Sequence, residues 1–430
     1  MKTYKLSELN TIEKEKLLSR QSIDFESVFE TVKPVLSEIK KNGLNAAVNY
    51  ALKFGENFGN NIKVTEEEFN EAELNIDYDL KAAIDTAARN IKIFHEKQFP
   101  SNYEIETMPG IVCSREFNAI ESVGLYIPGG SAVLFSTMLM LGIPAKIAGC
   151  GRVVVCSPTK NGKVDPALLY AAKICGINEF YKIGGAQAIG LMAYGDSQFP
   201  KVYKIFGPGN QFVTAAKLLV SIDPSGCAID MPAGPSEVLV IADEYASPDF
   251  VACDLLSQAE HGSDSQCILI TSSEELSKLV NLGIEKQLVN LSRKDTALDS
   301  LKNSFALIAG SIEDAIEFSN KYAPEHLILN LREAELYKNK IINAGSVFIG
   351  PYSPESAGDY ASGTNHTLPT SGYSKMHSGL GVESFMKSIT FQKISKAGIN
   401  IISNTVIKMA DAEKLTAHAN AVKVRMENEN

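Results

Sequence analysis

The feature that most constrains the fold is a repeated order of three parts: a short β-branched run, a turn that contains glycine, and a helix-prone segment. Three such units follow one another, at 152–175, 180–194 and 202–220. A second series has a helical segment at 249–261 and strand-like runs at 237–242, 267–270, 305–308 and 347–349. Strands that alternate with helices at this spacing favour parallel sheets covered by helices.

We therefore expect an α/β fold with two similar, incomplete Rossmann-like domains, each doubly wound and mainly parallel. The predicted division has four parts: a helical N-terminal arm at 1–24, a discontinuous domain at 25–125 and 237–380, a second domain at 126–236, and a C-terminal arm at 381–430. In this last arm a strand-like run at 401–403 precedes a polar helix. Such a helix buries little apolar surface alone, so the arm is expected to dock on another domain or subunit.

Composition narrows the classes of protein. The 430 residues carry a net charge of −10, which gives no reason to expect binding to nucleic acid or to an anionic membrane. The most apolar stretch, 132–145, is too short and too interrupted to span a bilayer, and no secretory signal is visible at the start. Seven dispersed cysteines without a Cys-x-x-Cys pair indicate reduced thiols that are buried in the core of a cytoplasmic protein.

The six histidines are few enough to consider singly. His95 lies in a charge-rich helical segment, where a surface position is expected. The clearest local feature is Gln258-Ala-Glu-His261 at a helix end before Gly262. Positions three apart on a helix share a face, so Gln258 and His261 can aim at one point. A metal site is one interpretation of this pair and a polar helix terminus is the other, since glutamine is an unusual ligand.

A second feature is the adjacent pair Glu325-His326, which follows Pro324 and enters the apolar run LILNL. An acid and an imidazole at a helix-to-strand junction can supply two proton-transfer groups. A capped turn with one satisfied histidine is the structural alternative.

A third feature is the Gly/Ser/Thr-rich segment 355–370, which shows no apolar periodicity and is interpreted as a long functional loop. Within it Asp359 can serve as a metal carboxylate, and His366 as a structural or substrate-side residue. Glycine-rich turns in IGGAQAIG and FGPGN follow predicted strands and could bring the backbone close to an anionic ligand. Neither turn has the strict G-x-G-x-x-G spacing, so a dinucleotide site does not follow from them alone.

Taken together, these segments resemble the histidinol dehydrogenase family. The motifs occur in the family's order and are GLYIPGG (124–130), IGGAQAI (183–189), GPGN (207–210), AGPSE (233–237), SQAEHG (257–262), PEHL (324–327) and ESAGDYASGTNHTLPT (355–370). The resemblance extends from about Gly124 to His418. It implies a zinc-dependent, NAD-linked oxidation of L-histidinol, through L-histidinaldehyde, to L-histidine in the last step of histidine biosynthesis.

The resemblance also implies roles for single residues. One zinc ion per subunit would be held by Gln258, His261, Asp359 and His418. In the family's homodimer His418 and the substrate-contacting Glu413 come from the partner subunit, so the fold would be a domain-swapped dimer. Glu325 and His326 match the acid–base pair. The remaining matched positions are Tyr126, Gln187 and Asn210 on the NAD side, and Ser236 and His366 on the substrate side; the zinc ligands and the acid–base pair also contact substrate.

Two other functions remain open from the residues. A zinc hydrolase would use Glu325 to activate water and would need no NAD. A binding module that has lost its chemistry would bind a nucleotide without turnover, although Glu325, His326 and the four presumed ligands are all retained.

Overall fold

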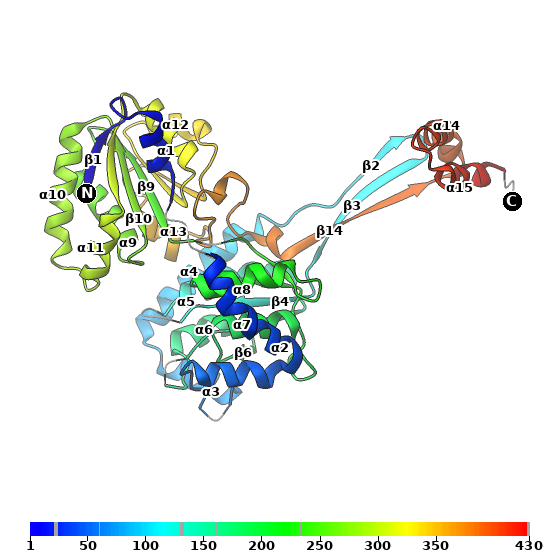
Figure 1. Cartoon of the computed structure of the whole chain (residues 1–430), viewed down its shortest axis with the longest axis horizontal. Helices are drawn as coiled ribbons and strands as arrows, with labels where there is room; N and C mark the ends of the chain where they lie inside the picture. Colours follow the sequence, from blue (N-terminus) through cyan, green and yellow to red (C-terminus); the bar gives the residue numbers. More distant parts are fainter. Residues whose placement is uncertain (21–24, 60, 130–132, 160, 233, 428–430) are drawn as a thin grey trace.

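Two parallel sheets and one antiparallel sheet organise the chain (Figure 1). The computed structural model describes residues 1–20, 25–59, 61–129, 133–159, 161–232 and 234–427. Gly130 of the first predicted motif and Ala233 of AGPSE lie outside the described residues.

The six-stranded sheet has the order β1-β11-β10-β9-β12-β13, and all its paired strands are parallel. Its strands are β1(Lys2–Lys5), β9(Glu237–Ala242), β10(Gln266–Thr271), β11(Phe305–Ile308), β12(His326–Asn330) and β13(Ser346–Ile349). The helices of this region are α1(Thr11–Leu18), α9(Pro248–Ala259), α10(Glu274–Leu288), α11(Lys294–Lys302), α12(Ile312–Tyr322) and α13(Glu355–Tyr360). Short 3₁₀ turns occupy Ala334–Lys340, Tyr373–Lys375 and Val382–Phe385.

The five-stranded sheet has the order β6-β5-β4-β7-β8 and is also parallel. Its strands are β4(Ser122–Tyr126), β5(Arg152–Cys156), β6(Glu179–Tyr181), β7(Lys204–Phe206) and β8(Ala228–Ile229). Its helices are α2(Phe25–Lys53), α3(Glu66–Asn75), α4(Tyr78–Glu96), α5(Phe135–Ala148), α6(Pro166–Ile174), α7(Gly185–Tyr194) and α8(Gln211–Ile222). The two sheets share one topology once the edge strand β1 is left out. If the five remaining strands of each sheet are numbered by their order in the chain, their order across the sheet is 3-2-1-4-5. The prediction of two similar doubly wound units is therefore confirmed.

The core strands are apolar on both faces because helices cover both faces of each sheet. All six residues of β9 are buried, and so are all five of β12. A parallel strand buried on both sides needs a continuous apolar run, which is the pattern that the sequence shows at these positions.

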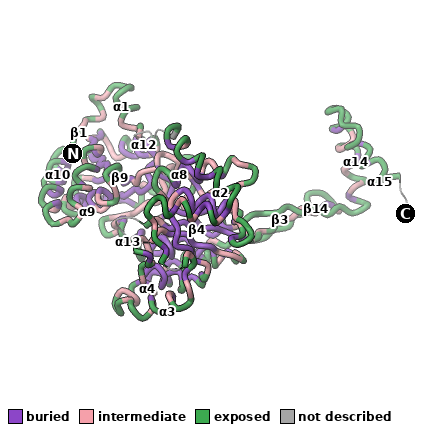
Figure 2. Tube along the Cα trace, turned by 60° about the horizontal axis from the view of Figure 1, so that its bottom comes forward, coloured by how far each residue is buried: buried purple, intermediate pink, exposed green. Residues whose placement is uncertain are grey.

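The third sheet is an extended arm of antiparallel strands in the order β14-β3-β2. It contains β2(Tyr103–Met108), β3(Ile111–Ala119) and β14(Met386–Ile394), and it leads to α14(Lys396–Ala412) and α15(Thr416–Glu427). Figure 1 shows the arm projecting away from both parallel sheets, with α14 and α15 at its far end. Nearly all of β14 is exposed, and Figure 2 shows the same along the arm.

Residues 103–119 belong to the arm and not to the domain at 25–125, and three further details of the predicted division differ from the structure. The helices within 25–96 pack on the five-stranded domain, where α2 contacts α7 and α8, and not on the domain at 237–380. The arm at 1–24 is not only helical, since β1 pairs with β11. Residues 401–403 lie inside α14 and form no strand. An amphipathic helix shows which of its faces is buried but not which sheet covers that face, and this explains the difference at 25–96.

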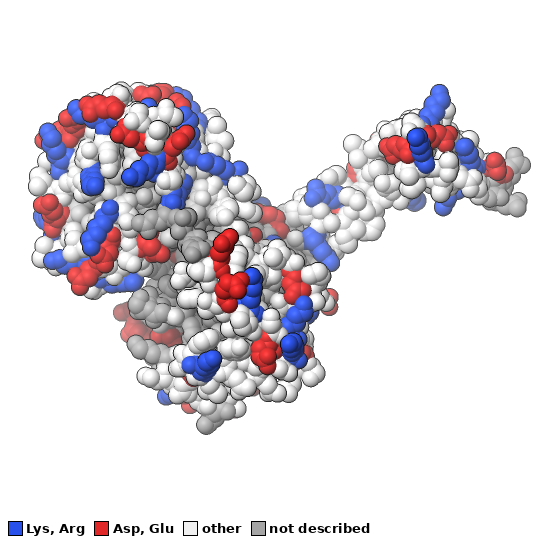
Figure 3. Space-filling model, in the orientation of Figure 1, with Lys and Arg blue, Asp and Glu red and all other residues white. Residues whose placement is uncertain are grey.

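Two expectations about single residues are also corrected. His95 is not on the surface: it is fully buried, with Nδ1 2.8 Å from the carbonyl oxygen of Ile91. The cysteines are all free, as expected, but only Cys156, Cys175 and Cys267 are buried. Within the described ranges, no helix combines the length and the apolar character that crossing a membrane requires. On the face drawn in Figure 3, acidic and basic side chains are interspersed.

Candidate active site

The candidate site is a cavity of about 640 Å³ between the two parallel sheets. On one side it is lined by Pro128 and by 207–210, which follow β4 and β7 of the five-stranded sheet. Between these two strands the strand order reverses, and ligands of open parallel sheets bind at such a switch point. On the other side it is lined by residues at the amino ends of β9 and β12, among them Ser236, Glu325 and His326.

The predicted acid–base pair, Glu325 and His326, lies at the junction between α12 and β12. Ala323 ends α12 in the left-handed region at φ 57°, and Pro324 stops any further helix. The chain then enters β12, and the amide of Ser346 donates to the carbonyl of Glu325 at 2.9 Å. The predicted helix-to-strand junction is therefore confirmed, with both side chains buried.

Both members of the pair are held by the backbone of Glu237. The amide of Glu237 donates to Oε2 of Glu325 at 2.9 Å, and its carbonyl oxygen lies 3.1 Å from Nδ1 of His326. A carbonyl can only accept, so Nδ1 carries the proton and Nε2 keeps its lone pair. Burial lowers the pKa of His326 to about 3, which keeps the ring neutral near pH 7. The ring therefore presents the lone pair of Nε2, which is the atom that a proton-accepting role would use.

A cluster of possible metal ligands faces this imidazole. His261, Glu355 and Asp359 each offer a ligand atom within 4.8 Å of the others. Glu355 and Asp359 are four residues apart on α13, so they share one face of that helix. Oδ1 of Asp359 lies 3.7 Å from Nε2 of His326, and Oε1 of Glu355 lies 3.7 Å from Nδ1.

Several buried polar atoms of this region lack a hydrogen-bond partner among the described residues. They are both amide atoms of Gln258, both carboxylate oxygens of Glu355 and Nε2 of His326. Gln258 lies on α9, which packs against α13, and its backbone carbonyl accepts from the backbone amide of His261 at 3.1 Å. Buried polar groups are normally paired, so an unpaired set of oxygen and nitrogen donors indicates a ligand that pairs them. Imidazole nitrogen with carboxylate and amide oxygens suits a divalent cation such as zinc.

The carboxyl groups are strongly perturbed by their surroundings. Burial raises the pKa of Asp359 to about 7. Burial first, and then the neighbouring Asp359 and Glu325, raise the pKa of Glu355 well above its ordinary value. Burial also raises the pKa of Glu325 well above its ordinary value. The hydrogen bond from the Glu237 amide opposes this rise, and the negative charges of Glu237 and Asp359 add to it. Three carboxyl groups in one low-dielectric site repel one another when ionised, and a bound cation relieves that repulsion.

The predicted substrate-side residues line the same cavity. Ser236 immediately precedes β9, and His366 lies beyond α13. Nδ1 of His366 lies 3.0 Å from the carbonyl oxygen of Asp359, and its Nε2 lies 3.1 Å from the hydroxyl of Thr137. His366 therefore links α13, which carries Glu355 and Asp359, to α5 of the other domain.

A buried ion pair shapes the glycine turn on the five-stranded side. Lys217 and Asp230 form this pair, and the amino group of Lys217 donates to the carbonyl of Gly207 at 2.8 Å. The amide of Gly207 donates to Asp230 at 2.8 Å. Gly207 has φ 118°, and a Cβ there would collide with the carbonyl of Tyr126. Asn210, after this turn, caps α8 and lines the cavity.

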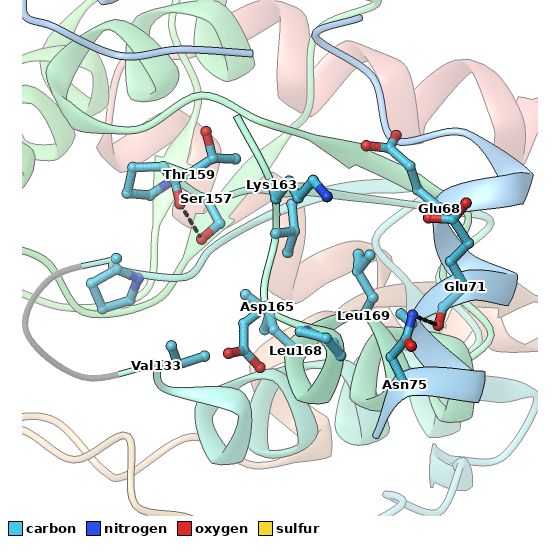
Figure 4. A pocket seen from close by; sticks show the side chains of 16 residues that line it. Glu68, Glu71, Asn75, Val133, Ser157, Thr159, Lys163, Asp165, Leu168 and Leu169 are labelled. Atoms are coloured by element: carbon cyan, nitrogen blue, oxygen red, sulfur yellow. Dashed lines mark hydrogen bonds between the residues drawn. The ribbon is translucent and has the colours of Figure 1, made fainter. Parts of the chain in front are cut away.

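The other two residues predicted on the NAD side are engaged within the five-stranded domain. The hydroxyl of Tyr126 accepts from the amide of Gly185 at 3.0 Å, and the amide of Gln187 donates to Glu56 at 2.7 Å. Both are buried, and neither lines the 640 Å³ cavity. A second cavity, of about 680 Å³, shares Pro128 with the first and lies where β4 and β5 end. Figure 4 shows Lys163 and the carboxylates of α3 on its wall.

The chain is similar over nearly its whole length to known proteins of one family. The family model described as histidinol dehydrogenase matches residues 18–426. The chain is 52% identical over 412 residues to a histidinol dehydrogenase of Bacteroides fragilis, covering 96% of each chain. It is 48% identical to the chloroplastic histidinol dehydrogenase of Arabidopsis thaliana, covering 99% of this chain and 91% of that one. The chain belongs to the histidinol dehydrogenase family. It is therefore an enzyme, and the resemblance seen in the sequence is confirmed.

The fold agrees with a solved member of the histidinol dehydrogenase family. The crystal structure of histidinol dehydrogenase from Elizabethkingia anophelis superposes with a TM-score of 0.94 at 49% identity, covering 99% of this chain and 98% of that one. The mixed α/β architecture with parallel sheets is thus shown for the family and for this chain.

Two predicted site residues are not brought to the cavity by their own chain. Glu413 follows α14 and His418 lies in α15, at the far end of the arm in Figure 1. Neither residue lines the cavity. A histidinol dehydrogenase site with His418 in it would therefore need the arm of another subunit.

Glu355 is the site residue that sequence reasoning missed. Its segment was interpreted as a loop, whereas 355–360 form α13. The available signal was the spacing Glu355–Asp359, which places two carboxylates on one helical face.

Proposed function

We propose that this enzyme oxidises L-histidinol to L-histidine, through L-histidinaldehyde, in two successive NAD-dependent steps of histidine biosynthesis. The observation that carries the proposal is the neutral Nε2 of His326, which lies 3.7 Å from Asp359 in a cavity between the two parallel sheets. A base beside a metal-ligand cluster, facing a switch point that suits a dinucleotide, is what a metal-assisted dehydrogenase requires.

The proposal includes one zinc ion per subunit. His261, Asp359 and Gln258 would hold it from this chain, with His418 of a second copy completing the set. The unpaired atoms of Gln258 and Glu355 fit a cation there. Bound zinc would hold the nitrogen atoms of the amino alcohol and so fix the carbon that loses hydride.

In the first oxidation His326 accepts the hydroxyl proton at Nε2 while hydride leaves the alcohol carbon for NAD⁺. The products are the aldehyde, NADH and one proton. Hydrogen bonding of Nδ1 to Glu237, together with the adjacent Glu325 and Glu355 carboxyls, stabilises the imidazolium that forms.

The second oxidation needs water. The aldehyde must first be hydrated to a gem-diol, because only the hydrated carbon can lose a hydride and become a carboxylic acid. Glu325 accepts a proton from that water as it adds to the aldehyde, and the proton that His326 gained in the first oxidation passes to the aldehyde oxygen. The result is a gem-diol and a neutral His326. The raised pKa of Glu325 makes its carboxylate a stronger proton acceptor than an exposed glutamate. His326 then accepts the proton of the gem-diol as the second hydride leaves for another NAD⁺.

We place the NAD side at the carboxyl edge of the five-stranded sheet, around Tyr126, Gln187 and Asn210. Asn210 reaches the cavity directly. Tyr126 and Gln187 are next to the turn at Gly184–Gly185, which opens α7. The shared residue Pro128 joins the two cavities, so an extended dinucleotide has room along this edge.

We also propose that the enzyme is a homodimer in which each arm reaches the partner's cavity. The arm exposes a row of large apolar side chains, which include Tyr103, Ile105, Met108, Ile389, Phe391 and Ile394. Exposed apolar surface on an arm that packs on neither parallel sheet marks an interaction site. A cytoplasmic location, expected from the cysteines, is part of the same proposal.

The deciding experiment supplies purified protein with zinc, L-histidinol and NAD⁺ and measures NADH by absorbance and histidine by chromatography. Two NADH per histidine support the proposal, since an alcohol must lose two hydrides to become an acid. Turnover without NAD would favour the hydrolase. Nucleotide binding without any turnover would favour the binding module.

A further inference from the structure

We propose that Arg20 is a positioning residue for the acid–base pair, acting from the N-terminal arm through Glu237. This inference rests on the proposed function, because it assigns a role in that reaction. Arg20 lies outside every motif that the chain shares with the histidinol dehydrogenase family.

The guanidinium of Arg20 forms two hydrogen bonds with the side chain of Glu237. Nε donates to Oε1 and Nη2 donates to Oε2, both at 2.9 Å. The side chains of Arg20 and Glu237 are only 14% and 2% exposed. A two-point contact of this kind fixes direction as well as distance, and burial shields it from screening by salt.

The backbone of Glu237 passes this constraint to the reacting groups. Its amide donates to Glu325, and its carbonyl accepts from His326. A rotation of the Glu237 peptide units would therefore loosen the water-activating carboxylate and the Nδ1–H contact together. Among the described residues, Glu237 is the one whose backbone contacts both side chains of the pair.

Arg20 holds the junction before Glu325 by other contacts as well. Nη2 also lies 3.4 Å from the carbonyl oxygen of Ala323, two residues before Glu325. The guanidinium stacks over the ring of Tyr322, the last residue of α12, at 3.5 Å. Arg20 thus contacts both the last residue of α12 and the residue that follows it, just before the chain enters β12.

This arrangement suits arginine and not lysine. A single ammonium could not make two parallel bonds to one carboxylate while lying flat on an aromatic ring. Arg20→Lys therefore keeps the positive charge but loses the two-point contact with Glu237 and the stacking on Tyr322. Arg20→Met loses the charge as well as these contacts. Arg332 provides the matched control, because its guanidinium stacks 4.0 Å over Tyr245 but is exposed beyond the other end of β12.

The test compares full-length, zinc-loaded wild type with Arg20→Lys, Arg20→Met and Arg332→Met. The first readout is the fraction of the consumed histidinol that leaves the enzyme as aldehyde and is trapped by a carbonyl reagent. This fraction does not depend on how much of the sample is folded. We expect Arg20→Met and Arg20→Lys to lower kcat about tenfold or more and to release aldehyde, because small misplacements of reacting groups are costly. The dissociation constant for zinc should change less than about threefold, since Arg20 touches none of the proposed ligands. Arg332→Met should match wild type in each measurement.

The second readout is hydrogen exchange at the amides of 237–240 and 326–329, measured without substrate. Faster exchange in both Arg20 variants, with none in Arg332→Met, supports the positioning role. Unchanged aldehyde release together with unchanged exchange would overturn it. If the wild type does not oxidise histidinol, the proposed function fails, while hydrogen exchange still decides whether Arg20 orders the pair.

Discussion

Nε2 of His326 lies 3.7 Å from Oδ1 of Asp359, and no described group forms a hydrogen bond with that nitrogen. The proposed base and a proposed metal ligand therefore face the same point, although 33 positions separate them in the chain. A substrate whose nitrogen atoms bind at the metal position would place its alcohol within reach of the base.

Glu355 should contribute to zinc binding. Its carboxylate is buried, has no hydrogen-bond partner among the described residues, and lies close to His261 and Asp359. We expect Glu355→Gln to weaken zinc binding about 10- to 100-fold, the range seen when groups next to metal ligands are changed. Competition with a chromophoric chelator measures this. Glu275→Gln, an exposed carboxylate on α10, should leave the affinity unchanged, and equal affinities in all three proteins would remove Glu355 from the metal site.

Glu325→Gln should separate the two oxidations. The amide keeps the shape of the side chain but cannot accept a proton from water. We expect the variant to retain zinc, to reduce the first NAD⁺, and to accumulate aldehyde that a carbonyl reagent traps. Loss of zinc from this variant would contradict the division between metal-binding and proton-transfer groups.

Asp230→Asn should damage both stability and NAD binding. The change leaves Lys217 buried without its counter-charge, which typically costs about 3–5 kcal/mol in the free energy of unfolding. It also weakens the contact that holds the amide of Gly207, so KM for NAD should rise. Urea denaturation and initial rates measure the two effects. Asp299→Asn, in the exposed pair with Lys302, should cost less than about 1 kcal/mol.

His95 should make stability depend on pH. Burial lowers its pKa from 6.5, so below that value the unfolded chain binds a proton that the folded chain refuses. The free energy of unfolding should therefore decrease as pH falls from about 6.5, the ordinary histidine pKa, toward the folded-state value. His95→Gln should make this slope shallower in denaturant titrations between pH 7.5 and 5.5. An identical slope in both proteins would show that His95 does not contribute.

Subunit mixing should reveal whether His418 acts in trans. His418→Ala and Asp359→Ala proteins should each be inactive, whereas a refolded mixture should regain activity because one site of the mixed dimer keeps both residues. The single substitution Ile389→Asp, on the exposed arm of an otherwise wild-type protein, should shift the population toward monomers in sedimentation. Confirmed mixed dimers without recovered activity would place His418 in the site of its own subunit.

The sequence predicted the elements of the parallel sheets well, because doubly covered strands such as β9 and β12 need unbroken apolar runs. It predicted less where local pattern and tertiary context diverge. Ile401 and Ile402 are β-branched and suggested a strand, yet they lie in the 17-residue helix α14. His95 sits among charged neighbours, and only the packing of α4 shows that it is buried.

The candidate site was predicted through short motifs, and the missing parts lie outside them or in misassigned local structure. Glu355 lies inside one of these motifs, but the Gly/Ser/Thr-rich composition of the segment predicts a loop where the structure has the helix α13. Arg20 contacts Glu237 across 217 positions of sequence, which no local pattern can indicate.

The most direct test is the ratio of NADH formed to histidine formed by zinc-loaded wild-type protein given L-histidinol. We predict two NADH per histidine, with activity lost on chelation and restored by zinc. A product that stops at the aldehyde with one NADH, or no reaction with histidinol, would contradict the proposed four-electron oxidation.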